Sequence, residues 1–177
     1  MLTKDNRNKI LELFFDSPTI SGGFGLREIS RLVNIAPKSV KLYLKEFEKE
    51  NLIIIKKNRQ SQPIYIPNRD NNYFKFLKRL NLQEKLYNSG VIDYLSMECV
   101  PKVIILFGSA SIGEDTEESD IDLFLLSKQK NLKLEKYENF LKRKISILFE
   151  NDFNKISGEL KNNLINGTIL YGYLKVF

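Results

Sequence analysis

Two short elements between residues 103 and 126 carry residue types that suit chemistry on phosphates. The apolar run 103–107 ends at Gly108-Ser109, and a second apolar run follows over 120–126. Glycine lets a ligand approach the backbone closely. Serine at the head of a short helix offers a hydroxyl and free backbone N–H groups. We therefore expect a phosphate-binding turn at Gly108 and Ser109.

The second run begins with two carboxylates, Asp120 and Asp122, two residues apart. Side chains alternate between the faces of a strand, so both carboxylates are expected on one face, about 7 Å apart. Such a pair can bracket a divalent cation. A phosphate-binding turn facing a carboxylate pair predicts metal-assisted chemistry on a polyphosphate.

The elements that must position this site alternate along the C-terminal part of the chain. Apolar runs at 103–107, 120–126 and 145–150 have the composition of buried strands, and 134–144 has the pattern of a helix. A further helix to about residue 163, a break at Gly167 and a last apolar stretch complete this part.

The pattern Gly108-Ser109-x-x-x-Gly113 followed by Ser119-Asp120-Ile121-Asp122-Leu123 resembles the minimal nucleotidyltransferases of the DNA polymerase beta superfamily, over about residues 90–177. The resemblance implies a small mixed sheet flanked by helices, a nucleoside triphosphate such as ATP, and Mg²⁺. It implies nucleotide contacts at Gly108, Ser109, Gly113 and Ser119, and catalytic metal binding by Asp120 and Asp122.

The sequence departs from that family at two positions. A third carboxylate normally lies on a later strand, and the matching position here is Ser146; Glu150 lies on the same face but roughly 13 Å further along. Ile112 stands where many relatives carry a cation. The acidic residues before Asp120 offer a substitute ligand: Glu114, Asp115, Glu117 and Glu118. We expect nucleotide binding to tolerate these departures better than transfer does.

The amino-acid composition excludes several kinds of catalytic and metal site. The chain has no histidine and a single cysteine, Cys99, which excludes Ser-His-Asp and Cys-His catalysis, a disulfide framework and a cysteine cluster for zinc. The apolar runs are too short to span a membrane and no signal region opens the chain, so a soluble cytoplasmic protein is expected. Residues 1–70 hold 13 Lys/Arg against 8 Asp/Glu, and residues 71–177 hold 15 against 14. The basic excess at the N-terminal side favours an anionic partner there.

Residues 1–67 show helical patterns at 4–16, 26–33 and 38–50, a glycine-containing loop over 17–25, and two β runs within 52–67. The segment REISRLVNIAPKSVKLYLKEFEKENLI resembles the winged helix-turn-helix superfamily, which implies binding of double-stranded DNA. The outward residues of the 38–50 helix would enter the major groove, and two cations at the hairpin tip would reach phosphates: Lys38, Ser39, Lys41, Leu42 and Lys45, with Lys57 and Arg59. A winged helix that contacts a protein is the alternative.

We thus predict a two-domain α/β (α+β) protein: a winged helix over 1–68, a helical connector over 69–98 and a nucleotidyltransferase fold over 99–177. Three functions stay open at this point. The protein is a Mg²⁺-dependent transferase that adds a nucleotide monophosphate to a hydroxyl of a protein or another acceptor, a DNA-binding transcriptional regulator with a weakened transferase domain, or an antitoxin-like protein with a toxin partner. The connector packs on a domain or forms a dimer seam. A homodimer is expected by analogy with winged helices that read palindromes, and no membrane contact is expected.

Overall fold

The computed structural model describes residues 6–16 and 23–176 and divides into two compact units between Lys78 and Arg79. The division falls inside the predicted connector. Residues 1–5 and part of the predicted 17–25 loop, residues 17–22, lie outside the described residues. The mixed α/β class predicted from the sequence is confirmed.

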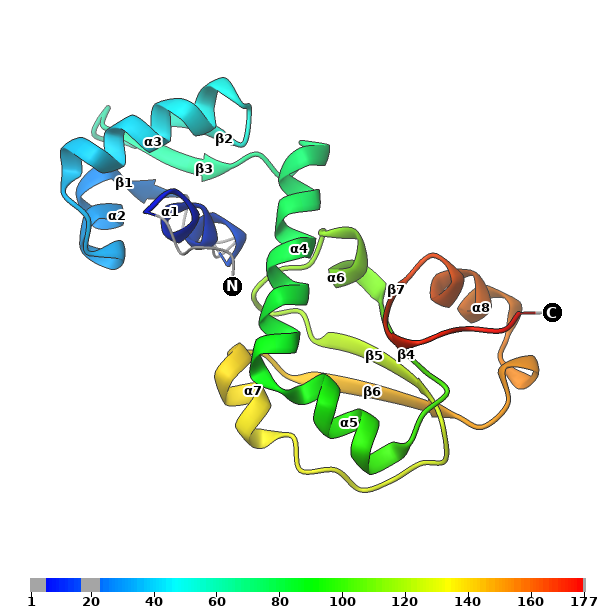
Figure 1. Cartoon of the computed structure of the whole chain (residues 1–177). Helices are drawn as coiled ribbons and strands as arrows, with labels where there is room; N and C mark the ends of the chain where they lie inside the picture. Colours follow the sequence, from blue (N-terminus) through cyan, green and yellow to red (C-terminus); the bar gives the residue numbers. More distant parts are fainter. Residues whose placement is uncertain (1–5, 17–22, 177) are drawn as a thin grey trace. The chain divides into compact units, whose positions relative to one another are not determined.

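The first unit consists of helices and a three-stranded antiparallel sheet in the order β1-β3-β2 (Figure 1). Its elements are α1 (Asn6–Phe15), β1 (Phe24–Gly25), α2 (Leu26–Val33), α3 (Pro37–Lys49), β2 (Ile53–Lys57), β3 (Pro63–Pro67) and the first turns of α4 (Asn72–Ser89). Strand β1 falls in the predicted glycine-containing loop, where Phe24 pairs with Tyr65 of β3.

Local sequence explains the turn between α2 and α3. Asn34 ends α2 in the left-handed conformation, with φ of 55°, which asparagine tolerates better than most residues. The Ser30 hydroxyl donates to the Ile35 carbonyl at 2.6 Å. Pro37 then opens α3, where its missing N–H costs nothing. The turn fixes which face of α3 is buried.

Apolar side chains of α1, α2 and α3 form the core of the first unit together with the sheet. From α3 it takes Val40, Leu44 and Phe47, each at most 1 % exposed. Phe74 of α4 joins the same core. The remaining side of α3, which carries its lysines, faces solvent.

The second unit is built on a mixed sheet in the order β6-β5-β4-β7, in which β5 and β6 are parallel and the other pairs antiparallel. Its elements after α4 are α5 (Val91–Cys99), β4 (Val103–Phe107), α6 (Gly108–Ile112), β5 (Ile121–Leu126), α7 (Glu135–Leu141), β6 (Ile145–Glu150), a 3₁₀ turn (Phe153–Lys155), α8 (Gly158–Ile165) and β7 (Thr168–Gly172) (Figure 1). Helix α7 ends three residues before the predicted end, because Lys142 adopts the left-handed conformation with φ of 55°.

Both faces of this sheet are covered by apolar contacts. Residues of α4, α5 and α7 pack against the face of β5 that carries Leu123. Phe153, Ile156 and Leu164 pack on the opposite face around Phe124. Two residues before Phe124, that same face of β5 carries Asp122, so a carboxylate lies at the start of the strand beside an apolar core.

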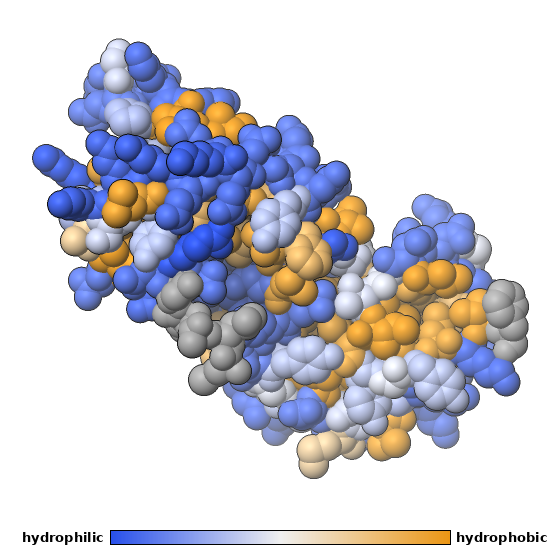
Figure 2. Space-filling view, turned by 45° about the horizontal axis from the view of Figure 1, so that its top comes forward, coloured by the Kyte–Doolittle hydropathy of each residue, from blue (hydrophilic) through white to orange (hydrophobic). Residues whose placement is uncertain are grey.

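No helix among the described residues has both the length and the hydropathy needed to cross a membrane. On the face that Figure 2 shows, hydrophilic side chains predominate and hydrophobic patches interrupt them.

Candidate functional site

The Gly-Ser turn and the carboxylate pair meet at one end of β4 and β5. In the antiparallel register Phe107 pairs with Asp122, and Gly108 follows Phe107 as the first residue of α6. Gly108 has φ of +69°, and a Cβ placed on it would lie 2.7 Å from the Asp122 Oδ2 atom. The backbone conformation therefore favours glycine, and a larger residue would also displace the Asp122 carboxylate.

The turn after Gly108 is held by local hydrogen bonds. The Ser111 hydroxyl donates to the Gly108 carbonyl at 2.7 Å. Gly113, with φ of 77°, ends the short helix α6. The Ser119 hydroxyl accepts from the Thr116 amide at 2.9 Å, so this side chain shapes the loop before β5. Ser109 stays partly accessible beside Gly108.

Burial and like charge both act on the Asp122 carboxyl. Desolvation raises its pKa above the usual value, and the neighbouring Asp120 charge raises it further, whereas Arg143 lowers it. Two carboxylates in this arrangement repel each other, and a cation between them would relieve that repulsion. The pair therefore has the electrostatics of a divalent cation site.

The neighbouring strand β6 carries no carboxylate at the position paired with Asp122. Asp122 pairs with Ser146 of β6, and Glu150 pairs with Leu126 at the far end of the strand. Within residues 6–16 and 23–176, no three His, Cys, Asp or Glu side chains gather closely enough to hold a metal ion. Mg²⁺ is commonly held by one or two carboxylates plus substrate phosphates. The donor set fits one Mg²⁺ that arrives with a triphosphate.

Arg143 fixes the loop that leads to the carboxylate pair, and the sequence patterns did not single it out. Its guanidinium donates to the Asp115 carboxylate at 2.6 Å, to the Ser119 carbonyl at 2.8 Å and to the Asp120 carbonyl at 3.1 Å. The side chains of Arg143 and Asp115 are 11 % and 3 % exposed. Asp115, one of the acidic residues considered as a substitute ligand, is thus engaged in a buried ion pair. The basic triplet 142–144 carried no signal that separates Arg143 from its neighbours.

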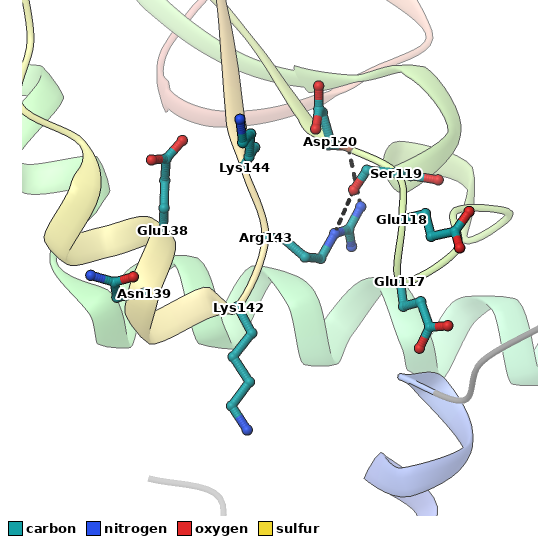
Figure 3. Close-up of a pocket in the computed structure, with 9 residues that line it drawn as sticks. All are labelled: Glu117, Glu118, Ser119, Asp120, Glu138, Asn139, Lys142, Arg143 and Lys144. Atoms are coloured by element: carbon teal, nitrogen blue, oxygen red, sulfur yellow. Dashed lines mark hydrogen bonds between the residues drawn. The ribbon is translucent and has the colours of Figure 1, made fainter.

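An open pocket of about 580 Å³ adjoins the carboxylate pair. Asp120 lines the pocket, whereas Gly108, Ser109 and Asp122 do not. The other lining residues come from the loop before β5, from α7 and from the turn between α7 and β6 (Figure 3): Glu117, Glu118, Ser119, Glu138, Asn139, Lys142, Arg143 and Lys144.

The residues predicted to contact DNA lie on α3 and the β2–β3 hairpin of the first unit. Lys38, Lys41, Leu42 and Lys45 are exposed on α3, and Ser39 is partly buried. Lys57 and Arg59 are exposed near the hairpin tip. The tip is ordered by the Asn58 side-chain oxygen, which accepts from the amides of Gln60 and Gln62 at 3.0 and 2.9 Å.

Residues 90–173 match the family described as polymerase beta, nucleotidyltransferase. The match covers most of the second unit and supports a nucleotidyltransferase-fold domain there. Comparisons of the chain with characterised proteins and with solved structures gave no match.

Proposed function

We propose that the second unit binds a nucleoside triphosphate such as ATP with one Mg²⁺ at the turn and carboxylate pair. Gly108 and Ser109 contact the phosphates, and Asp120 and Asp122 hold the cation. The observation that carries the proposal is the direct approach of Gly108 to the Asp122 carboxylate, which leaves phosphate and metal ligands side by side. Bound Mg²⁺ would neutralise phosphate charge and polarise the α-phosphoryl group.

Transfer of a nucleotide monophosphate is the reaction that such a domain would perform. The acceptor hydroxyl oxygen forms a bond to the α-phosphorus while the bond to the pyrophosphate leaving group breaks. The hydroxyl proton passes to water as the new bond forms, since Ser146 stands where a carboxylate would accept it. We therefore infer that binding is retained and that transfer is slow.

Equilibrium binding and transfer measured on the same protein test this proposal. ATP binding that requires Mg²⁺ and disappears in Asp122→Ala supports the site. Nucleotide transfer to a protein or another hydroxyl acceptor is followed with α-labelled ATP. Rapid transfer by the wild type that is lost in Asp122→Ala would overturn the inference that transfer is slow. Absence of Mg²⁺-dependent ATP binding by the folded wild type would overturn the site itself.

We further propose that the first unit is a winged helix that binds double-stranded DNA through α3. The observation in favour is that Lys38, Lys41 and Lys45 are exposed along one helix whose opposite side is buried. A helix of this kind fits the major groove, and the hairpin cations reach phosphates. A regulator that binds DNA and senses nucleotide follows from both proposals together.

A gel-shift titration with the full chain tests DNA binding. We expect affinity that falls as salt rises, because lysine contacts to phosphates release counterions. Lys41→Glu with Lys45→Glu should abolish the shift, and the matched pair Lys128→Glu with Lys133→Glu, exposed in the second unit, should leave it intact. Unchanged binding by the α3 variant would show that α3 is not the recognition helix.

A further inference from the structure

Lys144 immediately precedes β6 and lies level with Asp120, which immediately precedes β5. β5 and β6 are parallel, with Ile121 paired to Ile145 and Asp122 paired to Ser146. The Ile121 amide also donates to the Lys144 carbonyl at 2.9 Å, so the residues just before the first pair, Asp120 and Lys144, are neighbours too. Paired residues of adjacent strands point to the same face. One face therefore carries two carboxylates, just before and within β5, and an ammonium and a hydroxyl, just before and within β6.

The close-up view agrees with this placement. The Asp120 carboxylate and the Lys144 ammonium extend to the same side, whereas Lys142 extends away from them (Figure 3). Lys144 is exposed and lines the pocket together with Asp120. Arg143, between the two lysines, already binds Asp115 and the Ser119 carbonyl in the loop before β5.

No ion pair found among the described residues uses the Lys144 ammonium. This charge is thus available to an anionic ligand at the same face as the metal-binding pair. The position matters because β6 is the strand from which a second divalent cation would need a carboxylate, and Ser146 offers none.

The charges around this face favour one divalent cation over two. Asp120 and Asp122 together balance one divalent cation. A second divalent cation near Ser146 would find no carboxylate on β6 beside Asp122. The Glu138 carboxylate of α7 already accepts from the Ile145 amide at 3.0 Å, and the Lys144 ammonium would repel the cation. Triphosphate oxygens, in contrast, carry negative charge that an ammonium attracts.

We propose that Lys144 binds the phosphates of the nucleotide from the β6 side and, together with Ser146, keeps a second divalent cation out. The site then takes one divalent cation for each nucleoside triphosphate, and a protein side chain supplies the remaining positive charge. This inference rests on the proposed binding of a Mg²⁺-nucleoside triphosphate at the same site.

Counting bound Mn²⁺ on the full chain tests the inference without any need for turnover. With the α,β-methylene analogue of ATP, which resists cleavage at the α-phosphorus, electron paramagnetic resonance should count one bound Mn²⁺ per nucleotide in the wild type. The double variant Lys144→Met with Ser146→Asp should hold two. Two Mn²⁺ ions in the wild type, or one in the double variant, would overturn the inference.

Nucleotide affinity provides the second readout. Lys144→Met should weaken binding of the Mg²⁺-bound analogue about tenfold, the effect of one charge-assisted contact at an exposed site. Lys128→Met is the matched control, since it removes an exposed lysine of the second unit that does not line the pocket, and it should change affinity less than twofold. Equal effects of the two variants would overturn the role of Lys144 while the proposed function stands. Absence of binding by the wild type would instead refute the proposed function.

Discussion

Removing the Arg143 guanidinium should loosen the second unit more than any single surface substitution. The ion pair with Asp115 is nearly buried, at 11 % and 3 % exposure of the two side chains. Arg143→Met would leave the Asp115 carboxylate buried without its guanidinium partner, which costs about 3–5 kcal/mol in comparable cases. The Ser119 and Asp120 carbonyls would lose donors as well, at about 1 kcal/mol each.

Hydrogen exchange followed by mass spectrometry on the full chain measures this effect locally. We expect protection of the β4 and β5 peptides to fall by a factor of about one hundred or more, since 1.4 kcal/mol corresponds to a factor of ten. Peptides from α2 and α3 in the first unit serve as the internal control and should keep their protection.

A double variant separates the buried charge from the lost packing. Arg143→Met with Asp115→Leu removes both partners, and replacing a buried ion pair by apolar side chains is often close to neutral. The double variant should therefore be more protected than Arg143→Met alone. Protection that falls less than tenfold in Arg143→Met, or a double variant no better protected than the single one, would refute this reasoning.

Three other predictions follow from the same geometry. Asp122→Asn should stabilise the protein without metal at neutral pH: the raised pKa of Asp122 means that folding favours its protonated form, so its contribution is present at low pH and is lost as pH rises through the folded pKa. Urea titrations should show this gain shrinking toward acidic pH, and a loss at neutral pH would contradict it. Gly108→Ala should weaken ATP binding, because the new methyl group would contact the Asp122 carboxylate, whereas a Cβ on Gly90, which has a similar φ of +77°, would meet nothing within 4 Å. Equal effects of Gly108→Ala and Gly90→Ala on ATP binding would contradict the steric argument. Lys57→Gln with Arg59→Gln should lower the slope of log affinity for DNA against log salt by about two, one for each phosphate contact, and an unchanged slope would exclude the hairpin tip from the contact.

Sequence patterns predicted the elements that bury a continuous or periodic apolar surface. The helix at 26–33 and the strands at 103–107 and 145–150 are found where they were predicted. Strand β1 was not predicted, because its two residues, Phe24 and Gly25, are too few to show a periodic pattern and their pairing with β3 is a long-range contact. The end of α7 was predicted three residues too late, because a lysine, and not the usual glycine, takes the left-handed conformation there.

The sequence likewise predicted some residues of the candidate site and missed others. Short-range spacing was enough to identify Gly108, Asp120 and Asp122 as a group, and the approach of Gly108 to Asp122 brings turn and carboxylate together. The ion pair of Arg143 with Asp115 joins residues 28 positions apart. No local pattern marks such a contact, so it emerges only from the fold.

A crystal structure of the full chain with Mg²⁺ and the α,β-methylene analogue of ATP tests the central claim most directly. We predict the triphosphate at Gly108 and Ser109, with one Mg²⁺ that joins its oxygens to the carboxylates of Asp120 and Asp122. Nucleotide bound elsewhere on the chain, or bound at this turn with no metal on the two carboxylates, would contradict the account.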